Sequence, residues 1–149
     1  MLEYTAIAVR PTIVFGQYFK ALRDSKMALI LIVEDAMFSR KMIRKTLQKQ
    51  GYETLEAKNG KEGLELVREV NPDCILLDLL MPEIDGWEFL KILRAEGYKT
   101  PTIVITADIQ ETSRQQCLEL GAQAVLNKPP QAQVMQDAIE AVLATPSEG

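Results

Sequence analysis

Short runs of branched apolar residues alternate with longer amphipathic segments from Leu29 onward, and this alternation limits the fold more than any other feature of the chain. The runs at 29–33, 74–77 and 102–105 are continuous, which is typical of strands buried on both faces of a parallel sheet. Residues 52–57 and 122–126 are weaker candidates, which we expect nearer the sheet edges. The pattern predicts five strands in one sheet.

Apolar residues recur at helical spacing between these strands. Asn59 and Asp85 are suitable N-terminal caps for the second and third helices, and a fourth helix is expected over about 110–120. The apolar positions are Phe38, Met42, Ile43 and Leu47 in the first helix and Val134, Met135, Ala138, Ile139 and Val142 in the last. Right-handed crossovers then predict an α/β fold, a doubly wound five-stranded parallel sheet with helices on both faces.

Polar side chains follow four of the five expected strands. Glu34 and Asp35 follow the first strand, Asp78 the third and Thr106 the fourth, and Lys128 lies close after the fifth. The carboxyl ends of parallel strands share one edge of the sheet, where sites form in such folds. We therefore expect these five side chains to converge.

Three converging carboxylates repel one another, by roughly 4 kcal/mol per close pair at an effective dielectric near 20. Either some of them hold protons or a divalent cation neutralises them. Oxygen ligands without imidazole or thiolate favour Mg²⁺, or else Mn²⁺. Thr106 and Lys128 offer a hydroxyl and an ammonium to phosphoryl oxygens. Asp78, between them, is the candidate nucleophile, because an aspartate can form an acyl phosphate.

The 149-residue chain contains no histidine, which excludes a Ser-His-Asp triad, a Cys-His pair and a histidine-bearing zinc site. Its 17 Lys and Arg against 21 Asp and Glu give a net charge of −4, with no basic footprint for nucleic acid. Cys74 and Cys117 are too far apart for a CxxC motif and are expected to be buried thiols. No segment is long enough for a membrane span or typical of a signal peptide, so a cytoplasmic protein is expected.

Four segments carry a resemblance to a known family: Leu-Ile-Val-Glu-Asp at 31–35, Asp-Leu-Leu-Met-Pro-Glu-Ile-Asp-Gly at 78–86, Val-Ile-Thr-Ala at 104–107 and Lys-Pro at 128–129. In these segments the sequence resembles the receiver domain of two-component response regulators and is similar to the single-domain chemotaxis regulator. The resemblance covers about residues 28–144 and implies a flavodoxin-like sheet with strand order 2-1-3-4-5.

The resemblance also implies roles for the residues at the strand ends. Asp78 would be the phosphoacceptor, and Thr106 and Lys128 would contact the phosphoryl oxygens. The implied magnesium ligands are Glu34, Asp35, Asp78 and the backbone carbonyl of Leu80, with Glu34 at a position that often acts through a metal-bound water. Leu80 and Asp108 would influence how long the phosphoryl group survives.

Two positions near the expected lysine depart from the family pattern. Val125 occupies the place where many receivers carry a switch aromatic residue, which puts coupling of Thr106 to a moving ring in doubt. Pro130 follows Lys128-Pro129, where many relatives have a large apolar residue. The resemblance also implies a cis peptide bond between Lys128 and Pro129.

The expected partner that supplies phosphate is a histidine kinase or histidine phosphotransfer protein, since a chain without histidine cannot supply the phosphohistidine itself. The first helix carries five basic residues, Arg40, Lys41, Arg44, Lys45 and Lys49. This basic face is either a docking surface for that partner or a solvated helix face. Downstream signalling is expected through protein contacts of the last two helices, although a purely structural role of their apolar residues is the alternative.

The expected domain organisation is an extension at 1–27, a receiver domain at 28–145 and a short tail at 146–149. The extension is aromatic and has a net charge of +2 from Arg10, Lys20, Arg23 and Lys26 against Glu3 and Asp24. It could pack on its own receiver or bridge a homodimer. Alternatively, Met27 is the biological start.

Two other classes of function are weaker. An aspartate-nucleophile phosphohydrolase typically has a second acid two residues after the nucleophile, where this chain has Leu80. A degenerate receiver that serves only as a scaffold would not need the complete set of acidic, hydroxyl and lysine groups. We therefore expect a phosphorylation-controlled interaction module whose only catalysis is its own phosphorylation and dephosphorylation.

Overall fold

A computed structural model describes residues 28–144, and the predicted extension and tail lie outside these residues. Five strands and five helices alternate along the chain. The strands are β1 (Leu29–Val33), β2 (Glu53–Ala57), β3 (Cys74–Asp78), β4 (Thr102–Thr106) and β5 (Ala124–Asn127). The helices are α3 (Met37–Lys49), α4 (Gly60–Val70), α5 (Gly86–Ala95), α6 (Glu111–Glu119) and α7 (Ala132–Ala144).

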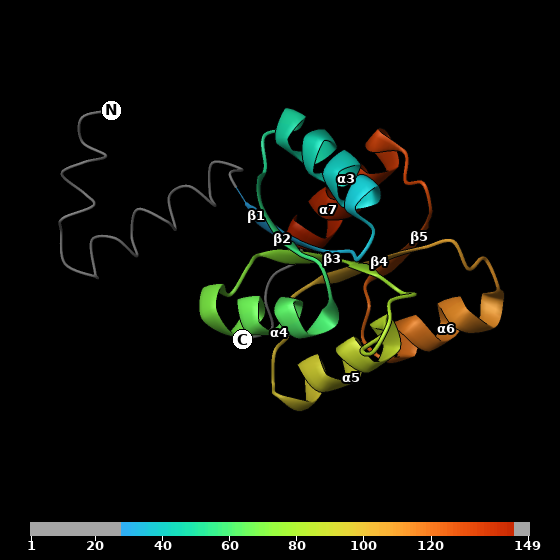
Figure 1. Cartoon of the computed structure of the whole chain (residues 1–149). Coiled ribbons are helices and arrows are strands. Elements are labelled where there is room, and N and C mark those ends of the chain that lie inside the picture. The colour runs from blue at the N-terminus through green and yellow to red at the C-terminus, as the bar shows by residue number, and fades with distance from the viewer. Residues whose placement is uncertain (1–27, 145–149) are drawn as a thin grey trace, which may run out of the picture.

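All strand pairs are parallel, and the order is β2-β1-β3-β4-β5, which confirms the expected fold. Figure 1 shows α3 and α7 on one face of the sheet and α4, α5 and α6 on the other. The three central strands are nearly or fully buried, as their continuous apolar sequences predict.

Alternate residues of the central strands build two separate cores. Leu31, Leu77 and Val104 belong to the cluster that includes Phe89 of α5. Their neighbours in sequence point to the opposite face, where the second cluster includes Met135 and Ile139 of α7; these neighbours are Ile30, Ile32, Leu76, Ile103 and Ile105. Because both faces of the three central strands are covered, a ligand can reach these strands at their ends.

The predicted caps of two helices are present. The Asn59 side chain accepts a hydrogen bond from the Glu62 amide at 2.8 Å, and Asp85 accepts one from the Glu88 amide at 2.9 Å. Gly51 has φ +94°, in the left-handed region that suits glycine after a helix. The two caps fix where α4 and α5 begin.

The first helix, α3, differs from its expected pattern. Ile43 and Leu47 are buried, but Phe38 is 77% exposed and Met42 is 50% exposed. Ile43 and Leu47 are four residues apart and share one helix face, whereas Phe38 and Met42 lie one position to the side of that stripe. The helix therefore presents apolar side chains to solvent beside its basic residues.

Two smaller expectations are confirmed. The Lys128–Pro129 peptide bond is cis. Cys74 and Cys117 are buried free thiols, and burial raises the pKa of Cys74 to about 12. Within residues 28–144, no helix combines the length and apolar character needed to cross a bilayer.

Candidate functional site

The candidate site lies at the carboxyl ends of four adjacent strands. Glu34 and Asp35 directly follow β1, Asp78 is the last residue of β3, and Thr106 is the last residue of β4. Asp78 pairs with Ile105, so Thr106 lies one residue beyond it on the neighbouring strand. The Lys128 amide donates a hydrogen bond to the Thr106 carbonyl at 2.9 Å, which fixes the chain after β5 to this edge.

The three carboxylates gather as the sequence predicts. One oxygen from each of Glu34, Asp35 and Asp78 lies within 4.8 Å of the other two. Glu34 is 2% exposed and Asp78 is 5% exposed, whereas Asp35 is open to solvent. The cluster therefore consists of two buried acids and one acid that faces solvent.

Lys128 is the cation that the structure places against the two buried acids. Its Nζ lies 2.7 Å from Glu34 Oε1 and 3.4 Å from Asp78 Oδ1. Burial acts to lower the pKa of Lys128, but the hydrogen bond from Lys128 to Glu34 and the charge of Asp78 outweigh burial, so the pKa is raised. Lys128 therefore stays charged at neutral pH.

Asp78 is strongly perturbed even with this cation beside it. Burial, followed by the negative charge of Glu34, raises the pKa of Asp78 from 3.8 to about 7, against the opposing effect of Lys128. One ammonium does not balance the three neighbouring carboxylates. The site therefore favours a proton or an additional cation.

The donor set fits a hard divalent cation. Glu34, Asp35 and Asp78 are the only such group of three acidic, histidine or cysteine residues in the described part of the chain, and all three offer oxygen. Mg²⁺ prefers one or two carboxylates together with water and phosphate oxygens, and the solvent-facing side at Asp35 leaves room for these. Burial and the charge of Glu34 raise the pKa of Asp78, so a cation bound at this edge would favour the ionised carboxylate.

Thr106 is buried and its hydroxyl is already oriented. Thr106 Oγ1 accepts a hydrogen bond from the Asp108 amide at 2.9 Å. The Asp108 carboxylate in turn accepts hydrogen bonds from the Ser113 hydroxyl at 2.6 Å and from the Gln110 amide at 3.0 Å. These two bonds lower the pKa of Asp108 and connect the threonine to the start of α6.

The structure brings together the side chains of Glu34, Asp35, Asp78 and Lys128 and places Thr106 at the end of the adjacent strand. Their roles in phosphoryl transfer remain predictions. Leu80 lies two residues beyond Asp78 and its side chain is 53% exposed, and the metal contact of its carbonyl remains a prediction as well.

Sequence reasoning missed the position of Arg40. The sequence placed it on a basic helix face that was either a docking surface or solvated, whereas in the structure its guanidinium turns back onto the loop after β1 and donates to the Glu34 carbonyl at 2.8 Å. Arg44 Nε lies 3.1 Å from Glu56 Oε2, so it also has an internal partner. The available signal was Ala36 at the helix start, a poor cap that leaves the loop in need of another support.

The family model of the response regulator receiver domain matches residues 30–140. This chain belongs to that family. It is the receiver domain of a two-component response regulator, a class of signal-transduction protein, and the expected family is confirmed.

Known relatives agree with this assignment of the receiver domain. The transcriptional regulatory protein SrrA of Staphylococcus aureus is 43% identical over 100 residues, which cover 67% of this chain and 41% of SrrA. The chemotaxis protein CheY4 of Vibrio cholerae has a TM-score of 0.74 and 34% identity, over 78% of this chain and 99% of that structure. A Francisella response regulator receiver domain has a TM-score of 0.75 and 28% identity, over 78% and 96%.

Proposed function

We propose that this receiver accepts a phosphoryl group on Asp78 from a phosphohistidine of a separate kinase or phosphotransfer protein. The observation that carries the proposal is the placement of Asp78. Asp78 is a nearly buried carboxylate at a strand end, and it forms an acidic cluster with Glu34 and Asp35 that can bind a cation. The Nζ of Lys128 lies 3.4 Å from Asp78 Oδ1. Burial restricts access by solvent while the strand end leaves a path for the donor.

In the proposed step, an Asp78 oxygen forms a bond to phosphorus as the bond between phosphorus and the donor's imidazole nitrogen breaks. The electron pair of that bond returns to the imidazole, which takes up a proton from solvent. Lys128 neutralises charge on the phosphoryl oxygens, and the Thr106 hydroxyl, whose oxygen accepts a hydrogen bond from the Asp108 amide, donates its proton to one of them. The side chains of Asp78, Lys128 and Thr106 thus supply the nucleophile, a positive charge and a hydrogen-bond donor, respectively.

The residues that would hold Mg²⁺ are Glu34, Asp35, Asp78 and the Leu80 carbonyl. The ion would supply positive charge for the phosphoryl oxygens. Mn²⁺ has the same ligand preference and should substitute.

Catalysis in this proposal is limited to the receiver's own phosphorylation and the later hydrolysis of its acyl phosphate. An aspartate-nucleophile phosphohydrolase, which turns over external substrates, typically has a second acid two residues after its nucleophile. The residue two positions along is Leu80, whose exposed side chain can neither give nor take a proton. Interaction rather than enzymatic turnover is therefore the proposed output.

The direct test is incubation with Mg²⁺ and a small-molecule phosphodonor, followed by intact-mass measurement. The unmodified protein should gain one phosphoryl group, and Asp78→Asn should gain none. Asp85→Asn is the matched control, because Asp85 caps α5 outside the acidic cluster and Asn caps equally well. A gain by Asp78→Asn equal to that of the unmodified protein would refute the assignment.

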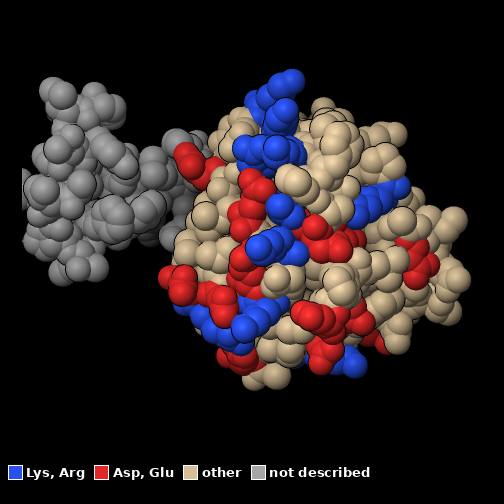
Figure 2. All heavy atoms as spheres, in the orientation of Figure 1, with Lys and Arg blue, Asp and Glu red and all other residues tan. Residues whose placement is uncertain are grey.

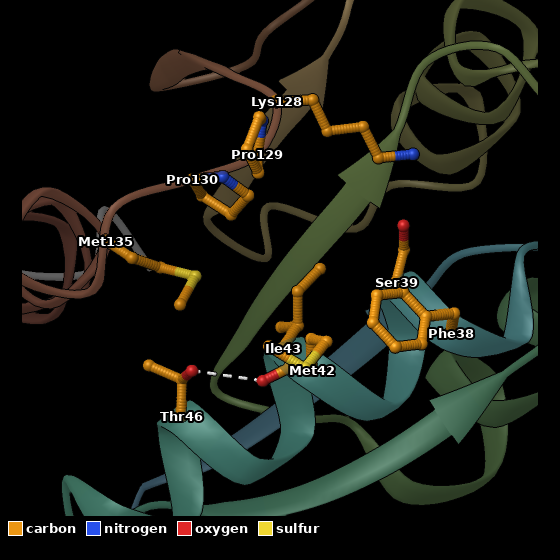
Figure 3. Close-up of a pocket in the computed structure, with 9 residues that line it drawn as sticks. All are labelled: Phe38, Ser39, Met42, Ile43, Thr46, Lys128, Pro129, Pro130 and Met135. Atoms are coloured by element: carbon orange, nitrogen blue, oxygen red, sulfur yellow. Dashed lines mark hydrogen bonds between the residues drawn. The ribbon is translucent and has the colours of Figure 1, made fainter.

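We also propose that the partner docks over α3 and the start of α7. A pocket of about 170 Å³ lies between them, and its lining residues are Phe38, Ser39, Met42, Ile43, Thr46, Lys128, Pro129, Pro130 and Met135. Figure 3 shows α3 on one side and the Lys128–Pro130 segment on the other. Lys128 thus contributes to both the pocket and the acidic site, which would bring a bound partner close to Asp78.

The charge beside this pocket favours an acidic partner surface. Figure 2 shows blue basic side chains gathered over the part of the molecule where α3 lies. Lys41, Lys45 and Lys49 are exposed, whereas Arg40 and Arg44 are paired with Glu56. The three lysines, rather than the two arginines, are the part of the basic face that is available to a partner.

Reversal of Lys41 and Lys45 to Glu should slow phosphotransfer from the protein donor while leaving phosphorylation by the small-molecule donor unchanged. Lys91→Glu provides a control, because Lys91 is an exposed lysine of α5 on the opposite face of the sheet. Unchanged protein-to-protein transfer in the double variant would show that the basic face is merely solvated.

We propose a cytoplasmic receiver at 28–145 that signals through protein contacts of α6, β5 and α7, with an extension at 1–27 that can support a homodimer and a tail at 146–149. The chain spans 41% of the length of SrrA. We propose that the receiver operates as a stand-alone module. Faster or slower hydrogen exchange in α6 and β5 on phosphorylation would support this output face, and unchanged exchange would oppose it.

A further inference from the structure

We propose that Arg40 is a positioning residue that holds the acidic loop after β1 in the geometry needed to bind the divalent cation. The inference rests on the proposed function, because the loop carries Glu34 and Asp35. It assigns to Arg40 a role inside the site in place of a role in partner docking.

The guanidinium of Arg40 contacts both residues of the acidic pair through their backbone. Its Nη1 donates to the Glu34 carbonyl at 2.8 Å and to the Asp35 carbonyl at 3.5 Å. The first of these is the stronger bond, and the second is at the limit of hydrogen-bonding distance. The side chain is 15% exposed, so most of it is withdrawn from solvent.

A second contact fixes the direction of this guanidinium. Arg40 Nε donates to Glu56 Oε1 at 3.1 Å, and the other oxygen of Glu56 lies 3.1 Å from Arg44 Nε. Glu56 belongs to β2 and pairs with Ile32 of β1, so its position is set by the sheet. Arg40 therefore connects the loop after β1 to a strand whose position is set by the sheet.

The loop needs this support because the start of α3 lacks a side-chain cap. The residue at the N-terminal cap is Ala36, which makes no side-chain capping bond. Within the loop, the Ala36 amide donates a hydrogen bond to Glu34 Oε2 at 3.0 Å. That bond uses the same carboxylate that receives Lys128 and would face the cation.

Arginine suits this task better than lysine. A planar guanidinium can donate to a carboxylate and to a carbonyl at the same time from fixed directions, whereas an ammonium is a compact charge on a flexible stem. We therefore expect Arg40→Lys to retain only part of the Mg²⁺ affinity that Arg40→Gln loses.

The test combines Arg40→Gln and Arg40→Lys with the control Arg68→Gln. Arg68 makes two hydrogen bonds to Glu96, at 2.9 and 2.6 Å, between α4 and the end of α5, so its loss removes a comparable arginine–glutamate pair elsewhere. Mg²⁺ affinity is measured without phosphodonor, from the amide chemical shifts of the unphosphorylated protein. Hydrogen exchange of the 34–37 amides is measured in metal-free buffer.

Arg40→Gln should weaken Mg²⁺ binding by about tenfold, the lower end of the loss seen when groups that orient metal ligands are removed. Exchange at 34–37 should become faster, and phosphorylation at saturating Mg²⁺ should return to within about twofold of the unmodified rate, since a positioning residue acts through the ligands. Arg68→Gln should leave the Mg²⁺ affinity, the loop exchange and the phosphorylation rate unchanged. Arg40→Lys should give values between those of the unmodified protein and Arg40→Gln.

Unchanged Mg²⁺ affinity and unchanged loop exchange in Arg40→Gln would overturn the inference. An equal effect of Arg68→Gln would overturn it too, since the cause would then be general destabilisation. Failure of the unmodified protein to become phosphorylated would refute the proposed function alone, because Mg²⁺ binding and loop exchange still decide the role of Arg40.

Discussion

Replacement of Asp78 by Asn should stabilise the metal-free protein, and the gain should grow with pH. The Asp78 carboxyl is 5% exposed. Burial, with the charge of Glu34, raises its pKa from 3.8 to about 7 in the folded chain. Asn has a similar shape and no charge, so the substitution removes the titrating carboxyl and the free-energy cost of burying its ionised form.

The sign follows from proton linkage. Below the unfolded pKa of 3.8, both states hold the proton and ionisation costs nothing. As pH rises towards the folded pKa of about 7, the unfolded chain ionises first, so stability is lost across this window and the loss is complete above it. At about 1.4 kcal/mol per pKa unit, the full loss is roughly 4 kcal/mol, of which some 2–3 kcal/mol falls between about pH 5 and pH 8.

Urea denaturation followed by circular dichroism, with chelator present, measures this difference. The advantage of Asp78→Asn over the unmodified protein should increase by about 2–3 kcal/mol between about pH 5 and pH 8. Asp85→Asn should show no such pH dependence, because it preserves a cap away from the acidic cluster. A stability difference that stays constant with pH would refute the proposed burial cost at Asp78.

Substitutions at three further positions test other parts of the structure by urea denaturation. Lys128→Met removes the cation beside Glu34 and Asp78 and should cost about 2 kcal/mol near pH 8 but less near pH 5, where a carboxyl can take a proton; an equal cost at both pH values would contradict this. Asn59→Ala removes the α4 cap and should cost about 1 kcal/mol, while Asn59→Asp should cost little; equal losses would show that the cap is unimportant. Gly86→Ala would place Cβ 2.7 Å from the Leu79 backbone and should cost roughly 1–3 kcal/mol, and a neutral result would show that the loop before α5 adjusts freely.

Most of the fold could be predicted because the central strands are buried on both faces. Their continuous apolar sequences distinguish them from the amphipathic helices without knowledge of any partner segment. The observed β1 is Leu29–Val33, the same residues as the predicted run, and β3 and β4 each extend one residue further to include Asp78 and Thr106. The convergence of the acidic residues followed from that topology.

The edges and surfaces were harder to predict, because they depend on contacts between distant segments. The fifth strand is Ala124–Asn127 rather than 122–126, since Gln123 bonds through both its amide and its side chain to Thr102 before the strand begins. The internal contacts of Arg40 could not be predicted, because a helical pattern cannot show that Glu56 of β2 lies within its reach. Only the register of α3 against the sheet contains that information.

Phosphorylation of Asp78, rather than of a neighbouring acid, is measured most directly by reduction of the phosphorylated protein. After incubation with Mg²⁺ and a phosphodonor, borohydride converts an aspartyl phosphate to homoserine, which peptide mass spectrometry locates in the sequence. We expect homoserine at position 78 alone and only when both Mg²⁺ and donor were present. Homoserine at position 35, or no reduced residue in a protein that binds Mg²⁺, would contradict the proposed site of phosphorylation.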